Sequence, residues 1–524
     1  MESRSDDRLT GILERLRRPK RQGRMTPGLT GVELTLDHAL LELLPAERRA
    51  AEITRRLVEQ ESLASDQIPN RPHLTEFKPL ALTTARELMQ RTPEDPHRAA
   101  ALPLGLLQAQ YRLELAAVSA LAPNDLTTDL LGEYLEAALD TLFELLLCYW
   151  RHQLPPQELL WNEAHALYQV ACHAGLDTLG SPQQTSTARQ LRAAYLKPLL
   201  LGSLNPTRYR PVEIRQIAAF LDRHVDCARL GGEDGLLCIE LDSSRPPGYL
   251  RRQAPANCVR LCVRGLVQRL DQQTAEALPT PRLARDMGRY WTRRQVRSEL
   301  HRRTDEQVTV VVGLDVIHQL LTGCNDDDLF PNQLQLREPS PTQVGRYTTA
   351  FPAACIDSSD GGARLRLDAG TADAVSPGAL VAVFSTATLS PRLGIVRWAQ
   401  VSKDFRLLAG LRWLPTNQQP CALRNLDSPL SMAFMRAFWN PGGAGDEAEL
   451  IAPTGIYRTG DSVQVRTAEG EFETFITTAM DTTFHVTLFR TRLQKMAADL
   501  DAQPPAPRDA GGSGASQAPA RPVE

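Results

Sequence analysis

This sequence of 524 residues has no large excess of either positive or negative charge. Its 59 lysines and arginines nearly cancel its 62 aspartates and glutamates, and the formal net charge is -3. Proteins that hold nucleic acids through the phosphate backbone need a marked surplus of basic residues. The composition therefore excludes general nucleic-acid binding as the expected activity.

Long hydrophobic runs are also missing. The richest one, residues 139–150, contains Asp140 and Glu144 and is shorter than the roughly 20 residues that cross a bilayer. The sequence starts without the apolar segment of a secretory signal, and its nine cysteines include no Cys-x-x-Cys pair. We expect a cytoplasmic protein without a transmembrane segment, whose cysteines are reduced thiols.

Signatures of catalysis and of cofactor binding are absent too. No Walker loop, Gly-x-Ser-x-Gly elbow or His-Glu-x-x-His motif occurs. One helical stretch contains His165, Cys172 and His173, but at this spacing their side chains would not meet at one metal ion. A further histidine, His318, has apolar neighbours. We interpret these side chains as packing residues and predict no metal, no cofactor and no enzymatic activity.

Helical periodicity dominates residues 34–230. Proline and glycine breaks divide this stretch into segments of ordinary helix length, as in a bundle or an array of helical hairpins. No repeat of fixed period is present. The clearest apolar stripe consists of Leu131, Leu135, Ala138, Leu142, Leu145 and Tyr149.

Alternation with a period of two replaces this pattern in the second half of the chain. Short strand-like segments with turn signals between them are typical of small antiparallel barrels or sandwiches. The predicted fold class is therefore α+β and multidomain. The predicted domains are a basic tail (1–30), a helical domain (34–230), a small β or linker subdomain (234–285), a β-barrel (290–416), a second β-rich unit (428–492) and a disordered tail (496–524).

One turn between two predicted strands has the composition of a ligand site. The run Asp357–Gly362 follows the pattern Asp-x-Ser-x-x-Gly, which places a carboxylate, a hydroxyl and two adjacent glycines at a chain reversal. Glycines there permit a close backbone approach, so that amide N–H groups can face an anion. The alternative interpretation is a polar hairpin turn in which Asp and Ser cap their own backbone.

Arginines ahead of the first predicted barrel strand, the turn motif and a later Gly-x-Arg-Trp strand together resemble a PilZ domain. That family folds as a six-stranded β-barrel and commonly binds cyclic di-GMP. The resemblance assigns its Arg-x-x-x-Arg motif to Arg293 and Arg297, with Arg294 beside them. It assigns the second motif to Asp357, Ser359 and Gly362. Arg302 and Arg303, which lie nearer to the strand, are alternatives for the arginine role.

The resemblance implies a specific chemistry for these residues. Guanidinium groups bond phosphate oxygens or guanine edges bidentately and stack on bases. The aspartate would accept from guanine N–H groups, and the serine and glycine amides would hold a phosphate. The expected protein is a bacterial signalling adaptor that binds cyclic di-GMP on the barrel and an unidentified protein partner through the helical half. The alternatives are an interaction scaffold that binds no nucleotide and, third, an enzyme with an unrecognised site.

Overall fold

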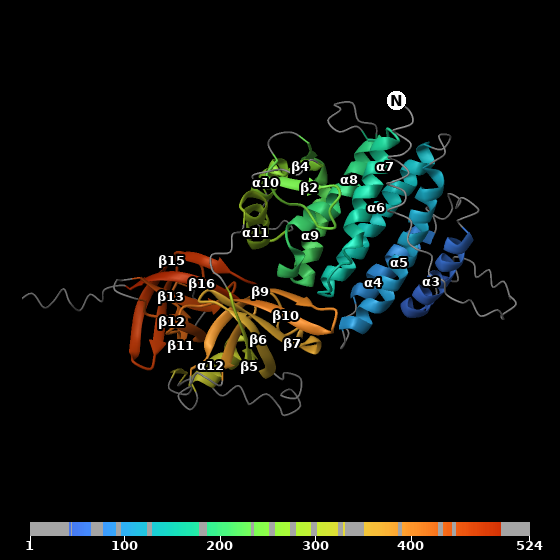
Figure 1. The fold of residues 1–524 in the computed structure, drawn as a ribbon. Coiled ribbons are helices and arrows are strands. Elements are labelled where there is room, and N and C mark those ends of the chain that lie inside the picture. The colour runs from blue at the N-terminus through green and yellow to red at the C-terminus, as the bar shows by residue number, and fades with distance from the viewer. Residues whose placement is uncertain are drawn as a thin grey trace, which may run out of the picture. The chain divides into compact units, whose positions relative to one another are not determined.

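Helices occupy the N-terminal half of the computed structural model and strands form two barrels after them (Figure 1). The predicted α+β multidomain class is confirmed. The structure describes residues 41–42, 44–63, 77–90, 96–122, 128–177, 186–231, 235–250, 257–272, 279–294, 301–322, 329–330, 350–385, 390–427, 433–442 and 447–493. Both predicted tails lie outside these residues.

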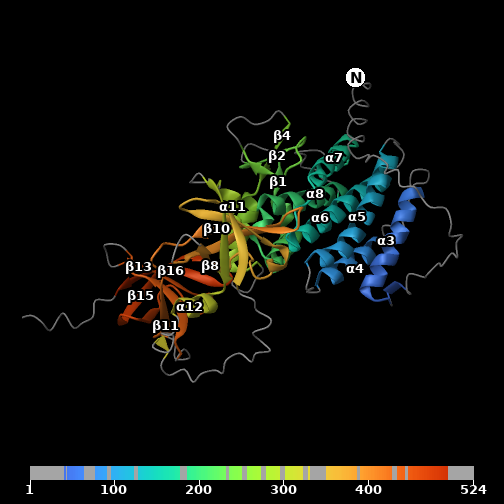
Figure 2. The same ribbon diagram turned by 60° about the horizontal axis from the view of Figure 1, so that its bottom comes forward.

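The helical domain is built on apolar stripes. All six residues of the stripe predicted from Leu131 to Tyr149 are buried in one helix, α6, which packs against α5 and α8. These helices lie side by side in both views (Figures 1 and 2). The elements of the domain are α3 (Ala46–Leu63), α4 (Lys78–Gln90), α5 (Pro96–Leu121), α6 (Thr128–Arg151), α7 (Leu159–His173), α8 (Ser186–Ser203), η3 (Pro206–Arg208), α9 (Pro211–His224) and η4 (Val225–Cys227).

A small four-stranded sheet and two helices follow. The sheet has the order β1-β4-β2-β3. Trp291 and Met287, on the second of the two helices, are fully buried in the same hydrophobic core as the helical domain. This subdomain therefore extends the helical core. Its elements are β1 (Arg229–Leu230), β2 (Leu237–Glu240), β3 (Gly248–Tyr249), β4 (Cys258–Cys262), α10 (Arg264–Asp271) and α11 (Pro281–Thr292).

A disulfide joins Cys238 and Cys258 in this sheet, with their Cα atoms 6.0 Å apart. The expectation that all cysteines are reduced thiols is wrong for this pair. The two residues are separated by 20 positions in the sequence, and the antiparallel pairing of β2 with β4 brings them together. Sequence spacing alone does not reveal such a pair, because sheet register decides which cysteines meet.

The first barrel is closed, with the strand order β10-β7-β6-β5-β8-β9. Alternate residues of each strand point inward, as Val308 and Val310 or Leu365 and Leu367 do, and they form a separate hydrophobic core. Its strands are β5 (Arg302–Val312), β6 (Ala350–Ser358), β7 (Gly362–Asp368), β8 (Leu380–Ser385), β9 (Arg392–Val401) and β10 (Arg406–Trp413). The connections include α12 (Leu314–Thr322) and η6 (Ala369–Thr371).

The second β-rich unit is also a closed barrel, with the order β11-β12-β13-β16-β15-β14. Cys421, Leu423, Val463 and Val465 point into its core. The strands are β11 (Gln419–Asn425), β12 (Met435–Asn440), β13 (Glu447–Pro453), β14 (Ser462–Thr467), β15 (Gly470–Thr482) and β16 (Val486–Leu493).

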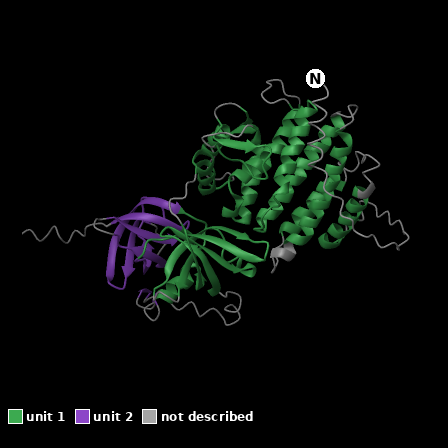
Figure 3. Ribbon diagram, in the orientation of Figure 1, with its two compact units in different colours: residues 1–321, 335–416, 482–486 green, residues 322–334, 417–481, 487–524 purple. Residues whose placement is uncertain are grey.

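The chain divides into two compact units (Figure 3). The first comprises residues 1–321, 335–416 and 482–486, and the second comprises residues 322–334, 417–481 and 487–524. Within the first unit, Leu154 packs against both the helical core and the barrel core, and the Val401 N–H donates to Gln153 O at 2.7 Å. No helix in the described ranges is long and apolar enough to cross a membrane.

Candidate functional site in the first barrel

The turn between β6 and β7 brings together the three motif residues Asp357, Ser359 and Gly362. Asp357 lies near the end of β6, and Gly362 begins β7. The Ser359 N–H donates to Gly362 O at 2.8 Å, which closes a tight reversal. The Ser359 hydroxyl lies 3.4 Å from the same oxygen. The carboxylate, the hydroxyl and the glycine backbone thus share one rim of the barrel.

Position 362 requires glycine because the backbone of β10 lies very close to it. A Cβ atom at this position would lie 2.3 Å from Leu411 O on β10, a main-chain atom that cannot turn aside. Next to it, the main-chain N–H of Trp413 donates to Gly361 O at 3.0 Å. The double glycine therefore lets β10 pass directly against the turn and holds it there.

Replacing Gly362 with alanine is expected to destabilise the first barrel by about 1–3 kcal/mol, because β7 and β10 must separate to admit the methyl group. Thermal unfolding of the full chain measures this loss. Gly370→Ala is the matched control, because the nearest atom to its Cβ would be the Asp368 carboxylate oxygen at 3.5 Å. Equal stability of Gly362→Ala and the parent chain would contradict the close approach.

An arginine and a histidine contact the Asp357 carboxylate. One oxygen accepts from an Arg364 guanidinium N–H at 2.6 Å, and the other lies 2.9 Å from His301 Nδ1. In the sheet, Asp357 lies between Arg303 on β5 and Arg364 on β7. Arg364 is 42% exposed, so this ion pair is of the weak surface kind that can be exchanged for another partner.

A further arginine, Arg392, contacts the main chain of the turn. The Arg392 guanidinium donates to Asp360 O at 2.6 Å and lies over the Trp413 ring, 4.8 Å from its centroid. The rim thus offers a partly exposed carboxylate, several guanidinium groups and an aromatic face. Such a set can bind an anion, accept hydrogen bonds from N–H groups and stack on a planar ring.

The arginines assigned by the PilZ resemblance come from another element. Arg293 caps the C-terminal end of α11, where its carbonyl accepts a hydrogen bond from the Tyr249 hydroxyl at 2.5 Å, and Arg294 follows it. Both side chains are exposed, and Arg297 lies outside the described residues. Arg302 and Arg303, the alternatives, are exposed at the start of β5, where they pair with Ser358 and Asp357 of the turn strand.

His301, Arg364 and Arg392 belong to the rim, and the sequence did not single them out. A signal for Arg364 existed, because it stands two residues after Gly362 and therefore on the same side of β7 as that glycine. For Arg392 and His301 the placement depends on barrel closure and on the β5–β6 register. Those are long-range features that local spacing does not encode.

Of the other histidine and cysteine candidates, His165 and His318 are packed inside the protein, Cys172 is partly buried and His173 is exposed. His165 is buried, its Nδ1 lies 2.8 Å from the Tyr195 hydroxyl, and burial lowers its pKa to about 4. His318 is fully buried. Burial also raises the pKa of Cys355, which precedes the turn, and keeps it a thiol. Among the described residues, no group of three His, Cys, Asp or Glu side chains is placed to hold a metal.

Comparison with known families bears on the helical domain. The model described as "Cyclic-di-GMP receptor FimW, N-terminal domain" matches residues 39–234. This part of the chain is similar to the N-terminal domain of a cyclic di-GMP receptor. The match covers α3 to α9, the short helix η4 and the first strand, β1, of the small sheet. No curated protein matches the chain.

Proposed function

We propose that the protein is a bacterial receptor and signalling adaptor that binds cyclic di-GMP at the β6–β7 turn of its first barrel. The observation that carries this proposal is the combination of two independent features. Residues 39–234 match the N-terminal domain of a cyclic di-GMP receptor, and the barrel that follows carries the Asp-x-Ser-x-x-Gly turn. The PilZ resemblance of that barrel points to the same ligand.

The chemistry of the rim suits a dinucleotide with two phosphates and two guanines. In the proposed complex Asp357 exchanges Arg364 for the N–H edge of a guanine, which presents donors that a carboxylate accepts. Ser359 and the backbone at Gly362 hold a phosphate, and Arg293, Arg294 and Arg297 close over the ligand from the segment ahead of β5. Cyclic di-GMP is then bound as a ligand and is not turned over.

The helical domain is the proposed output, through an unidentified protein partner. The connection between α6 and α7 offers a route for coupling. Gln153 accepts a hydrogen bond from Val401 on β9, and the adjacent Leu154 packs against both cores. A displacement of the barrel strands would therefore reach α6 and α7 directly.

One observation favours the rival function, an interaction scaffold that binds no nucleotide. Arg364 and His301 already engage both oxygens of Asp357 within the chain. In the scaffold the turn is a structural element, and its charges only stabilise the rim.

Calorimetric titration of the full chain with cyclic di-GMP decides between the two functions. Saturable binding is expected, and Asp357→Ala or Arg297→Ala should each weaken it by about tenfold to a hundredfold, because a hydrogen bond to a charged group contributes roughly 1.5–3 kcal/mol. Asp368→Ala is the matched control, since Asp368, at the far end of β7, likewise faces an arginine, Arg406, at 3.5 Å. Binding to that variant should equal binding to the parent chain.

The opposite pattern would reject the receptor function. If the parent chain releases no heat with cyclic di-GMP, and Asp357→Ala lowers the melting temperature, the turn residues are structural and the scaffold remains. Binding that survives every turn variant would instead place the nucleotide at another site.

A further inference from the structure

A row of arginines lies on the outer surface of the second barrel. In the sheet, Ala422 on β11 pairs with Arg436 on β12 and with Arg466 on β14. Its neighbours Cys421 and Leu423 point into the barrel core, so Ala422 and Arg424 point outward. We call Ala422, Arg424, Arg436 and Arg466 the arginine face.

This outer surface is covered, although the outside of a barrel ordinarily meets water. Ala422 is fully buried because Leu329 and Phe330 pack on it together with Phe434. Leu329 is 3% exposed and Phe330 is 9% exposed. These two residues come from the connection between β5 and β6, far from β11 in the sequence.

Each arginine contributes a specific contact to this arrangement. The Arg466 guanidinium donates to Leu329 O at 3.0 Å and lies 4.1 Å from the centroid of the Phe434 ring. Arg436 lies 5.1 Å from the centroid of the Phe330 ring, and Arg424 lies 5.0 Å from that of Phe434. Guanidinium groups on aromatic faces, joined by a main-chain hydrogen bond, are the contacts with which a protein recognises a peptide.

Charge adds to this recognition. Three guanidinium groups on one surface attract acidic segments. Glu471 pairs with one of them, Arg466, across the β14–β15 hairpin. In the sequence, Asp326, Asp327 and Asp328 directly precede Leu329.

We propose that the arginine face is a recognition site for an acidic peptide with a Leu-Phe anchor. Its occupant is this chain's own Leu329–Phe330 segment. Phe330 supplies the aromatic anchor and the Leu329 carbonyl supplies the hydrogen-bond acceptor. The three aspartates that precede them in the sequence make this segment acidic. A protein that carries acidic residues followed by a Leu-Phe pair would compete with this segment for the arginine face.

Hydrogen exchange of the full chain tests the intramolecular part. Phe330→Ala removes the buried ring, and the double variant Arg436→Ala/Arg466→Ala removes the hydrogen bond to Leu329 O. Each should speed exchange at residues 329 and 330 by about tenfold or more. Glu471→Ala is the first control, because it removes the ion pair of Arg466 and leaves the contact with Leu329. Arg490→Ala is the second, since Arg490 pairs with Glu447 elsewhere on this barrel.

Titration with a labelled peptide tests the recognition itself. A fluorescent peptide with the sequence of residues 325–334 should bind the Phe330→Ala chain with a Kd below about 1 mM, the range of effective concentrations for a tethered segment. It should bind the parent chain at least tenfold more weakly, because the site is occupied there. Adding Arg466→Ala to the Phe330→Ala chain, or changing the three aspartates of the peptide to asparagine, should weaken binding by about tenfold.

Three results would overturn the proposal. The first is unchanged exchange at residues 329 and 330 in both sets of variants. The second is peptide binding that does not depend on the arginines or on the aspartates, and the third is no peptide binding at all. Exchange in β11 and β12 reports whether the second barrel stays folded. If Phe330→Ala unfolds it, Arg436→Gln in the full chain replaces that variant, and unchanged exchange at residues 329 and 330 of that chain would equally reject the proposal.

Discussion

Replacing Trp291 with alanine is expected to lower the free energy of unfolding of the helical core by about 3–5 kcal/mol, the cost of removing a large aromatic side chain from a packed interior. Trp291 is fully buried, and its indole N–H donates to the Ser203 hydroxyl on α8 at 3.0 Å. It fastens α11 to the helical domain. The variant loses the ring, the hydrogen bond and the attachment together.

Denaturant unfolding of the full chain, followed by the helical circular dichroism signal, measures this effect. Ser203→Ala separates the two contributions, since it removes the hydrogen bond and leaves the ring in place; its expected cost is about 1–3 kcal/mol. Trp291→Phe keeps most of the apolar volume and should fall between the two. A loss below 1 kcal/mol for Trp291→Ala would mean that α11 is not part of the helical core.

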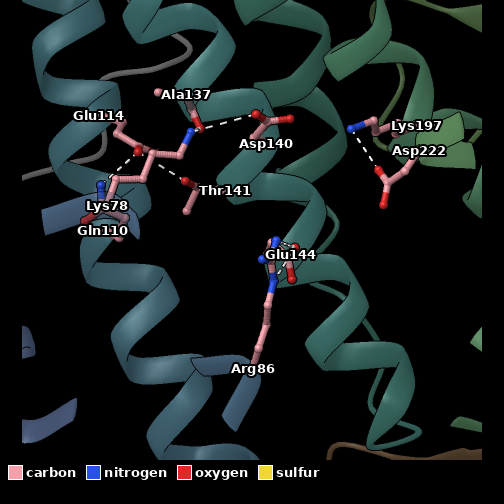
Figure 4. Close-up of polar contacts among 10 residues, drawn as sticks. All are labelled: Lys78, Arg86, Gln110, Glu114, Ala137, Asp140, Thr141, Glu144, Lys197 and Asp222. Atoms are coloured by element: carbon pink, nitrogen blue, oxygen red, sulfur yellow. Dashed lines mark hydrogen bonds and ion pairs between the residues drawn. The ribbon is translucent and has the colours of Figure 1, made fainter. Parts of the chain in front are cut away.

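Glu114 should make the stability of the helical domain fall between about pH 4.5 and pH 7. The carboxyl group is fully buried between α5 and α6, where Gln110 and Thr141 donate to one of its oxygens at 2.8 and 3.1 Å (Figure 4). Burial raises its pKa to about 7, against the opposing effects of Lys78 and of these two hydrogen bonds.

The sign follows from proton binding. Between the ordinary pKa of a glutamate and the raised one, the folded chain keeps a proton that the unfolded chain has lost, so raising the pH favours unfolding. The loss across this window is about 3 kcal/mol. Glu114→Gln preserves the shape of the neutral acid and should remove this part of the pH dependence.

Chemical denaturation at pH 5 and at pH 7.5 measures the difference. Glu133→Gln, an exposed position on α6, is the control and should keep the pH dependence of the parent chain. If Glu114→Gln loses stability equally with rising pH, the carboxyl group is not the source of the effect. Glu136 on α6, whose pKa burial also raises, would then be the next group to replace.

Local patterns in the sequence predicted the elements well. The stripe from Leu131 to Tyr149 gave α6 because a spacing of three and four residues places apolar side chains on one side of a helix. Apolar residues alternate with arginines from Ala363 to Leu367, a pattern that predicts a strand for the corresponding reason, and this segment is β7. The turn at Asp357 was found because glycines next to Asp and Ser mark a reversal whatever surrounds it.

Contacts between distant parts of the chain could not be predicted in this way. The disulfide of Cys238 with Cys258 and the pairing of Asp357 with Arg364 and His301 depend on strand register. The burial of Phe330 on Ala422 depends on a connection of the first barrel reaching β11. The periodicity of a segment does not predict its contacts with distant segments, because neither partner of such a contact departs from its own local pattern.

Leu154 has a consequence for the history of this protein. A side chain that packs in two hydrophobic cores is selected by both at once. A substitution that improves the helical interior but opens a gap beside the barrel would be removed, and the reverse holds equally. Any replacement of Leu154 therefore has to fit the helical domain and the first barrel together. A recombination event that exchanged one of them alone would inherit a mismatched residue at this position.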